Sequence, residues 1–123
     1  MEEQRVGKKW GYEIWFANND KYCGKLIAIN KGKWSSEGRF HYHKTKDETF
    51  FVIEGQLILE YEENNNFYSI TLKEDQSFRV FPTIKHRFST DSDQCKFIEA
   101  STTHMEFDSY RCEWDKEKEE WVE

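Results

Sequence analysis

Short runs of β-branched and aromatic residues recur along most of this chain, and turn-forming residues separate them. Runs of this length and composition are typical of β-strands. We expect nine strands, at residues 12–17, 22–30, 37–43, 49–54, 56–62, 67–72, 77–81, 86–90 and 95–101. Turn formers such as Gly55, Asn64 and Asn65 lie between them at intervals of roughly 8 to 12 residues. The pattern predicts an all-β sandwich or barrel.

Length and composition indicate one globular domain spanning residues 1–123. A chain of 123 residues buries one core but is too short for two. Aromatic residues make up 17% and charged residues 34% of the chain, so it has the core formers that disordered proteins lack and too little hydrophobicity for a membrane protein. We expect the barrel core at about residues 12–101, with the N-terminal strand at 10–17.

The formal net charge of -6 is unevenly distributed. Residues 1–50 carry 10 Lys and Arg against 7 Asp and Glu, whereas residues 51–123 carry 8 against 17. No basic stripe follows any expected strand, so nucleic acid is not an expected partner. The tail at residues 113–123 is densely charged, and we expect a solvated helix or a frayed end there. Its Trp121 and Val122 are apolar and can pack on the barrel or on a partner subunit.

The cysteines and the N-terminus favour a cytoplasmic protein. The chain has an odd number of cysteines, and none of them form a CxxC pair; they are Cys23, Cys95 and Cys112. Such a set is typical of reduced thiols. Residues 1–9 are polar and do not form the apolar segment of a signal peptide. No run of about 18 apolar residues is present, so no membrane-spanning helix is expected.

Three of the four histidines have a spacing that suits metal binding. Side chains two apart on a strand share a face, so His41 and His43 point the same way, and the turn that follows can bring Glu48 beside them. His86 offers a fourth ligand from a distant strand. Imidazole and carboxylate suit one divalent ion such as Zn, Mn, Fe or Ni, with positions left for water or substrate. We expect His104 at the surface or in support of this site.

The segment around these residues resembles the cupin superfamily. The first cupin motif reads G, five residues, HxH, three or four residues, E, six residues, G. Here His41, His43, Glu48 and Gly55 fit that spacing, while Gly38 lies closer to His41 than the pattern asks.

The second cupin motif reads G, five residues, PxG, two residues, H, three residues, N. The chain keeps its Pro82 and His86, and has Gln76, Ile84 and Thr90 at the remaining positions. The resemblance covers about residues 25–100. It implies a double-stranded β-helix, or jelly-roll barrel, with the metal near one mouth.

Within the cupins, a longer match is to the type II mannose-6-phosphate isomerase-like domain. That group typically has a basic residue, Pro, Trp and Gly before a strand, and residues 8–11 resemble this segment. Three further motifs of the group also have counterparts here: E-H-W at residues 48–50, P-x3-H-R at residues 82–87 and I-E-V at residues 98–100. The group's closing Tyr-Gly-Arg segment is reduced to residues 107–111. The resemblance implies a metal-dependent aldose-ketose isomerase of carbohydrate metabolism, acting on a sugar or phosphosugar.

Such an isomerase removes a proton beside a carbonyl, while the metal polarises the carbonyl oxygen and stabilises the enediolate. A base must then lie within hydrogen-bond reach of that proton. Glu99 is the candidate, because it stands between Phe97 and Ser101 on one strand face and the resemblance keeps an acid there. Arg87, beside His86, is a second catalytic candidate.

Further residues are candidates for substrate binding. Arg79 and Lys85 can hold a phosphate or carboxylate of a small-molecule substrate. Tyr42 can line the pocket, although aromatic residues more commonly fill a barrel.

Two other functions fit the same ligand set. An oxygenase would use iron there, with two open positions for O2 and substrate. A non-catalytic sugar-binding cupin would bind its ligand without turnover.

A homodimer is also expected, because Trp10, Trp15 and Phe16 place more apolar surface near the first strand than a free edge should expose.

Overall fold

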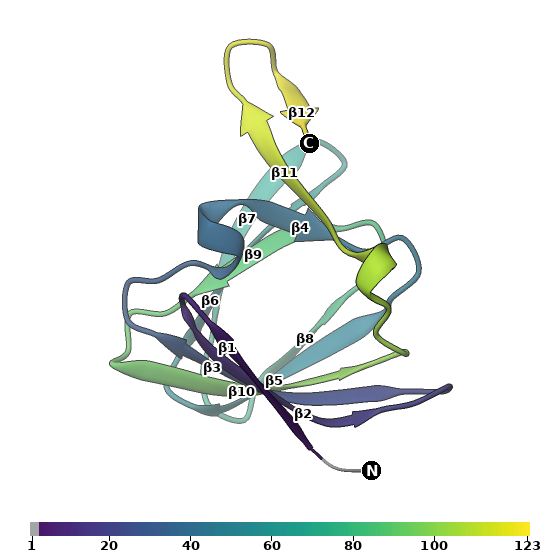
Figure 1. The fold of residues 1–123 in the computed structure, drawn as a ribbon. Coiled ribbons are helices and arrows are strands. Elements are labelled where there is room, and N and C mark those ends of the chain that lie inside the picture. Colours follow the sequence, from purple (N-terminus) through teal and green to yellow (C-terminus); the bar gives the residue numbers. More distant parts are fainter. Residues whose placement is uncertain (1–2) are drawn as a thin grey trace.

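A computed structural model describes residues 3–123, and these residues form almost entirely β-structure. Two antiparallel six-stranded sheets face each other (Figure 1). The first sheet has the order β1 (Gln4–Lys8), β2 (Gly11–Asn18), β3 (Cys23–Asn30), β10 (Gln94–Ser101), β5 (Glu48–Glu54) and β8 (Ser77–Val80). The second has the order β12 (Glu120–Val122), β11 (Tyr110–Asp115), β4 (Phe40–Tyr42), β9 (Lys85–Ser89), β6 (Leu57–Glu63) and β7 (Asn66–Leu72). Two short 3-10 turns, η1 (Ser35–Gly38) and η2 (Glu106–Asp108), complete the fold.

The hydrophobic core lies between the two sheets. Alternate residues of each strand point inward, so Ile27 and Ile29 of β3 meet Leu59 of β6 and are almost fully buried. Phe97 packs edge to face against Phe88, with ring centroids 5.1 Å apart. The expected all-β jelly-roll barrel is thus confirmed.

β1 was not expected, because its residues do not alternate between apolar and polar. It pairs with β2 at the edge of the first sheet, from Gln4 opposite Trp15 to Lys8 opposite Gly11. An edge strand that buries little surface needs no apolar face, so no periodicity marks it. Residues 1 and 2 of the expected polar N-terminus lie outside the described residues.

The expected strand at residues 37–43 begins later than predicted. Ser36 and Glu37 have φ values of 52° and 56°, and Gly38 has a φ of 89°, so the chain turns there. This left-handed backbone cannot continue a strand. β4 therefore starts only at Phe40, and η1 is placed beside β9 and β4.

The charged tail is a β-hairpin, so the expected helix or frayed end is wrong. β11 and β12 pair with Trp114 opposite Trp121, and the hairpin extends past the end of the barrel (Figure 1). Trp121 also contacts Phe40 and Phe67, with ring centroids 5.3 and 5.8 Å apart. The charged residues gather in the turn, where Asp115 Oδ1 accepts backbone hydrogen bonds. Aromatic packing across the outer face of the second sheet thus holds the tail.

The apolar residues that motivated a homodimer are mostly covered by their own chain. Trp10 is buried against Phe88, and Trp15 packs beside His104 and Lys25. Only Phe16 of the three is strongly exposed, at 48%. The homodimer stays a prediction that these residues do not support.

Within residues 3–123, no helix reaches the length and hydrophobicity that spanning a bilayer requires.

Candidate metal centre

Three histidines converge on the inner face of the second sheet. His41 of β4 lies directly opposite His86 of β9, and their ring centroids are 4.2 Å apart. His43 follows β4 on the same face, with its ring centroid 5.6 Å from that of His41. One ring nitrogen from each of the three lies within 4.8 Å of the others. This is the spacing of ligands that share one metal ion.

Hydrogen bonds fix the orientation of two of these rings. His43 Nδ1 donates to the carbonyl oxygen of Asp108 at 2.7 Å, and His86 Nδ1 donates to that of Ile84 at 2.8 Å. Asp108 is held in turn, because its carboxylate accepts the backbone N–H groups of residues 44–46. Each Nε2 therefore keeps a free lone pair, as in protein metal sites where the other ring nitrogen donates to a carbonyl.

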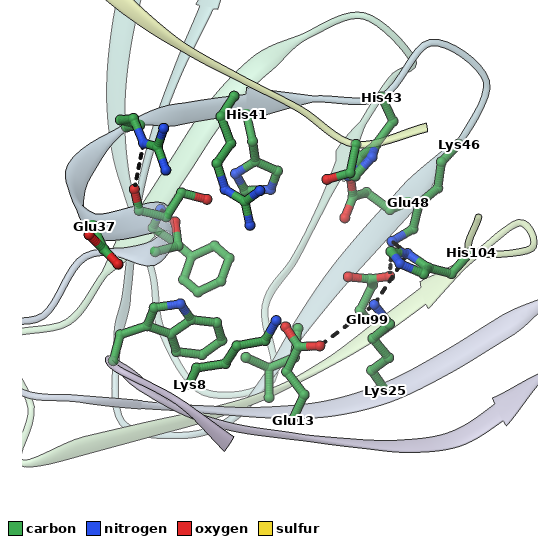
Figure 2. A pocket seen from close by; sticks show the side chains of 18 of the residues that line it. Lys8, Glu13, Lys25, Glu37, His41, His43, Lys46, Glu48, Glu99 and His104 are labelled. Atoms are coloured by element: carbon green, nitrogen blue, oxygen red, sulfur yellow. Dashed lines mark hydrogen bonds and ion pairs between the residues drawn. The ribbon is translucent and has the colours of Figure 1, made fainter. Parts of the chain in front are cut away.

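Glu48, at the start of β5, faces these rings from the opposite sheet (Figure 2). Its Oε2 lies 3.4 Å from His43 Nε2 and 3.5 Å from His86 Nε2. Among residues 3–123, Glu48 Oε2, His86 Nε2 and His41 Nδ1 are buried without any hydrogen-bond partner. Buried polar atoms left unpaired are costly, and a divalent cation satisfies all of them at once. The donor set therefore fits a metal ion.

Burial also keeps the imidazoles in the form that binds metal. It lowers the pKa of His86 to about 3 and lowers the pKa of His41 well below its ordinary value, with further contributions from the neighbouring histidines. The pKa of His43 is lowered by burial and by Lys46. All three rings are thus neutral at neutral pH, with lone pairs available for coordination.

His41 and His43 line a cavity of about 370 Å³ between the two sheets. Its apolar wall consists of Trp10, Ile27, Phe50 and Phe88. Its remaining wall is strongly charged, with Glu48 beside His43 and with Lys46, Glu99 and Lys25 around His104 (Figure 2). A volume of this order, with an apolar wall and a few convergent polar groups, is typical of a small-molecule site.

A network of buried charges around His104 lies beside His43, whose ring centroid is 6.5 Å from that of His104. Lys46 Nζ lies 2.5 Å from Glu99 Oε2 and 3.2 Å from His104 Nδ1. Lys25 Nζ lies 3.4 Å from His104 Nδ1 and 3.7 Å from Glu13 Oε1. Two lysines and two glutamates are thus paired around one neutral imidazole, which satisfies their charges out of water.

The two carboxylates nearest the metal centre differ in their ionisation. Burial raises the pKa of Glu48 well above its usual range, and the neighbouring charge of Glu99 adds to this effect. For Glu99, burial is outweighed by Lys46 and Lys25, which lower its pKa to about 2. Glu99 is therefore a carboxylate at neutral pH.

The structure brings Glu99 to the cavity with three of the expected metal ligands, His41, His43 and Glu48, while His86 lies against His41 and does not line the cavity. It does not bring the other site candidates there. Arg87 points away from His86 to the outer face of β9, where it pairs with Glu60 at 2.7 Å. Adjacent residues on a strand must face opposite ways, which explains this placement. The catalytic role expected of Arg87 has no support from its position.

The three expected substrate-binding residues also lie outside the cavity. Arg79 pairs with Asp47 at 2.5 Å, and Lys85 lies over the rings of Tyr42 and Trp121. Tyr42 stacks on Tyr110, on the face opposite His41. Their expected substrate contacts stay predictions, with no support from the geometry.

Sequence reasoning missed Lys25 and Lys46 and gave His104 only a supporting or surface role. A signal for Lys25 was present, because it shares a strand face with Ile27 and Ile29 and therefore points into the core. Lys46 lies in the turn between β4 and β5, where no periodicity predicts its direction. His104 is nearly buried and lines the cavity.

The model of the family described as the cupin domain matches residues 25–101 of this chain. This chain belongs to the cupin family. No curated protein matches it. Its structural similarity to other cupin-fold proteins is high although the sequence identity is low, so the likeness to them shows the fold alone.

Three solved structures illustrate that likeness. The capsular polysaccharide assembling protein CapF from Staphylococcus aureus has a TM-score of 0.76 at 15% identity, over 89% of this cupin and 34% of CapF. Oxalate decarboxylase from Bacillus subtilis has a TM-score of 0.78 at 13% identity, over 89% of this cupin and 30% of that chain. KdgF from Halomonas sp. has a TM-score of 0.68 at 15% identity, over 87% of this cupin and 92% of KdgF. This cupin thus spans about a third of the first two proteins and nearly all of the third.

Proposed function

We propose that this cupin is a metal-dependent sugar isomerase that moves a proton between adjacent carbons of its substrate. One observation carries the proposal: two of the three converging histidines, His41 and His43, line the same cavity as the ionised Glu99, which lies on the other sheet. A substrate in this cavity can therefore contact a metal on one side and a base on the other. The resemblance to type II mannose-6-phosphate isomerases supports a sugar or phosphosugar as the substrate.

His41, His43, His86 and Glu48 would hold the divalent ion. When bound, the ion supplies Lewis acidity, which polarises a carbonyl oxygen of the substrate and makes the adjacent C–H more acidic. The apolar wall formed by Trp10 and neighbouring side chains excludes water from that oxygen.

Glu99 is the proposed base. Its carboxylate faces the cavity near Glu48 (Figure 2). Lys46 and Ser101 donate hydrogen bonds to Glu99 Oε2, which fixes the carboxylate's orientation. Glu99 would accept the proton from the carbon beside the carbonyl and return it to the neighbouring carbon, as isomerisation requires.

Hydrogen exchange in D2O tests this proposal. Protein purified with added Zn²⁺ is incubated without oxygen with fructose 6-phosphate or fructose, and NMR follows deuterium at carbons 1 and 2. We expect deuterium incorporation and conversion to the aldose in wild type, and a loss of at least about 100-fold in Glu99→Gln. Lys96→Gln, a change on the same strand that is away from the cavity, is expected to retain the wild-type rate.

The alternatives give different results in the same experiment. An oxygenase needs iron and consumes O2, and a sugar-binding module binds its ligand without exchange. Absence of exchange with any aldose or ketose, whether phosphorylated or neutral, would contradict the isomerase proposal.

A further inference from the structure

The mouth of the cavity gathers positive charge in a protein whose net charge is -6. Lys8 lines it from the end of β1, Lys9 from the turn that follows, Arg39 from the residue after η1, and Arg111 from β11. None of these four residues was singled out as a candidate from the sequence. Figure 2 shows Lys8 extending into the cavity from the side opposite His43.

Arg111 stands nearest the metal centre of the four. It is the direct cross-strand partner of His41, so the two side chains share the inner face of the second sheet. Directly opposite residues on one face have Cβ atoms about 5 Å apart. The guanidinium of Arg111 is long enough to reach a substrate whose other end lies at the histidines.

Arg111, Arg39 and Lys8 are not neutralised by the protein. Among residues 3–123, none of the three lies within ion-pair distance of a carboxylate, although the cavity's other cations, Lys9, Lys25 and Lys46, are all paired. Glu37 and Glu106 are the exposed acidic residues that line the cavity, and they lie 3.0 Å from Lys9 Nζ and 3.5 Å from His104 Nε2, respectively. The pKa of Glu37 is lowered chiefly by Lys9 and further by Arg39 and Arg111.

From this arrangement we infer that the substrate carries an anionic group, a phosphate or a carboxylate, which Arg111 binds together with Arg39 and Lys8. Like charges repel one another, and an anion placed among them relieves that repulsion. Guanidinium groups match both phosphate and carboxylate oxygens in geometry. The inference rests on the proposed function, because that function places the other end of the substrate at the metal. It replaces Arg79 and Lys85, the residues expected from the sequence to bind the anion, with residues at the cavity mouth.

Calorimetric titration of the Zn²⁺-supplemented protein tests the inference without turnover. The probes are fructose 6-phosphate, glucuronate and neutral fructose. We expect at least one anionic probe to bind about tenfold or more tightly than fructose, and Arg111→Gln to weaken that binding about 10- to 100-fold. Binding of fructose is expected to be unchanged in the variant. Arg39→Gln is expected to act in the same direction with a smaller effect.

Arg5→Gln is the matched control, because Arg5 lies on β1, stacks on Tyr12 and does not line the cavity. It changes the net charge equally and is expected to leave all three affinities unchanged. Preference for fructose 6-phosphate identifies the anion as a phosphate, and preference for glucuronate identifies it as a carboxylate. Equal binding of all probes, or equal losses in Arg111→Gln and Arg5→Gln, would overturn the inference. Anion binding that depends on Arg111 without deuterium exchange would retain the inference and count against the isomerase alone.

Discussion

Replacing His43 with alanine is expected to lower the affinity of this protein for divalent metal by at least about 100-fold. His43 contributes one of three imidazole nitrogens that converge within 4.8 Å. Loss of a residue that only orients a ligand typically costs 10- to 100-fold in affinity, so loss of a ligand costs at least as much. Competition with a chromophoric chelator, using protein first stripped of metal, measures the change.

The fourth histidine of the chain provides the matched control. His104 lines the same cavity, but its Nδ1 faces Lys25 and Lys46, and its ring centroid lies 6.5 Å from that of His43. His104→Gln is expected to bind metal within a few fold of wild type. Circular dichroism should show the β-fold intact in both variants. Undiminished metal affinity in His43→Ala, or an equal loss in His104→Gln, would be incompatible with the assigned ligands.

Replacing Lys46 with methionine is expected to reduce the free energy of unfolding by about 3 kcal/mol or more. The substitution leaves Glu99 buried, 4% exposed, without its closest cation. Removal of one partner of a buried ion pair typically costs about 3 to 5 kcal/mol, because the remaining charge has neither water nor a counterion. Urea denaturation of protein stripped of metal measures the loss.

Two further variants make this result specific. Lys31→Met alters an exposed lysine on the loop after β3 and is expected to change stability by less than about 0.5 kcal/mol. The double variant Lys46→Met with Glu99→Gln removes both charges and should recover part of the loss, since the two residues are coupled. Wild-type stability in Lys46→Met would show that the pair with Glu99 is not closed in solution.

The fold was predictable because its core strands carry the pattern that buried strands need. Residues such as Ile27, Val52 and Phe97 recur at alternate positions between turn formers, and all of them lie in the core. β1 and the C-terminal hairpin lacked such a pattern. Gln4 to Lys8 form a mostly exposed edge strand, and β12 depends on the long-range contact of Trp121 with Phe40 and Phe67, which no local periodicity encodes.

Local spacing predicted the metal centre better than it predicted the substrate site. His41 and His43 share one face, and the short connection from β4 to β5 keeps Glu48 close to them, although β5 lies in the other sheet and the two strands do not form the hairpin that the sequence suggested. Arg87 was selected for being next to His86, yet strand alternation places neighbouring side chains on opposite faces. Arg111 reaches the cavity through the pairing of β11 with β4, which was not predicted because no strand was expected after residue 101.

X-ray absorption spectroscopy of the zinc-loaded protein tests the metal centre most directly. The spectrum is predicted to show nitrogen and oxygen ligands at about 2.0 to 2.2 Å, with the multiple scattering of three imidazole rings. The same measurement on His43→Ala, loaded at high zinc concentration, should show two rings. A first shell that contains sulfur, or one without imidazole scattering, would contradict a metal held by His41, His43 and His86.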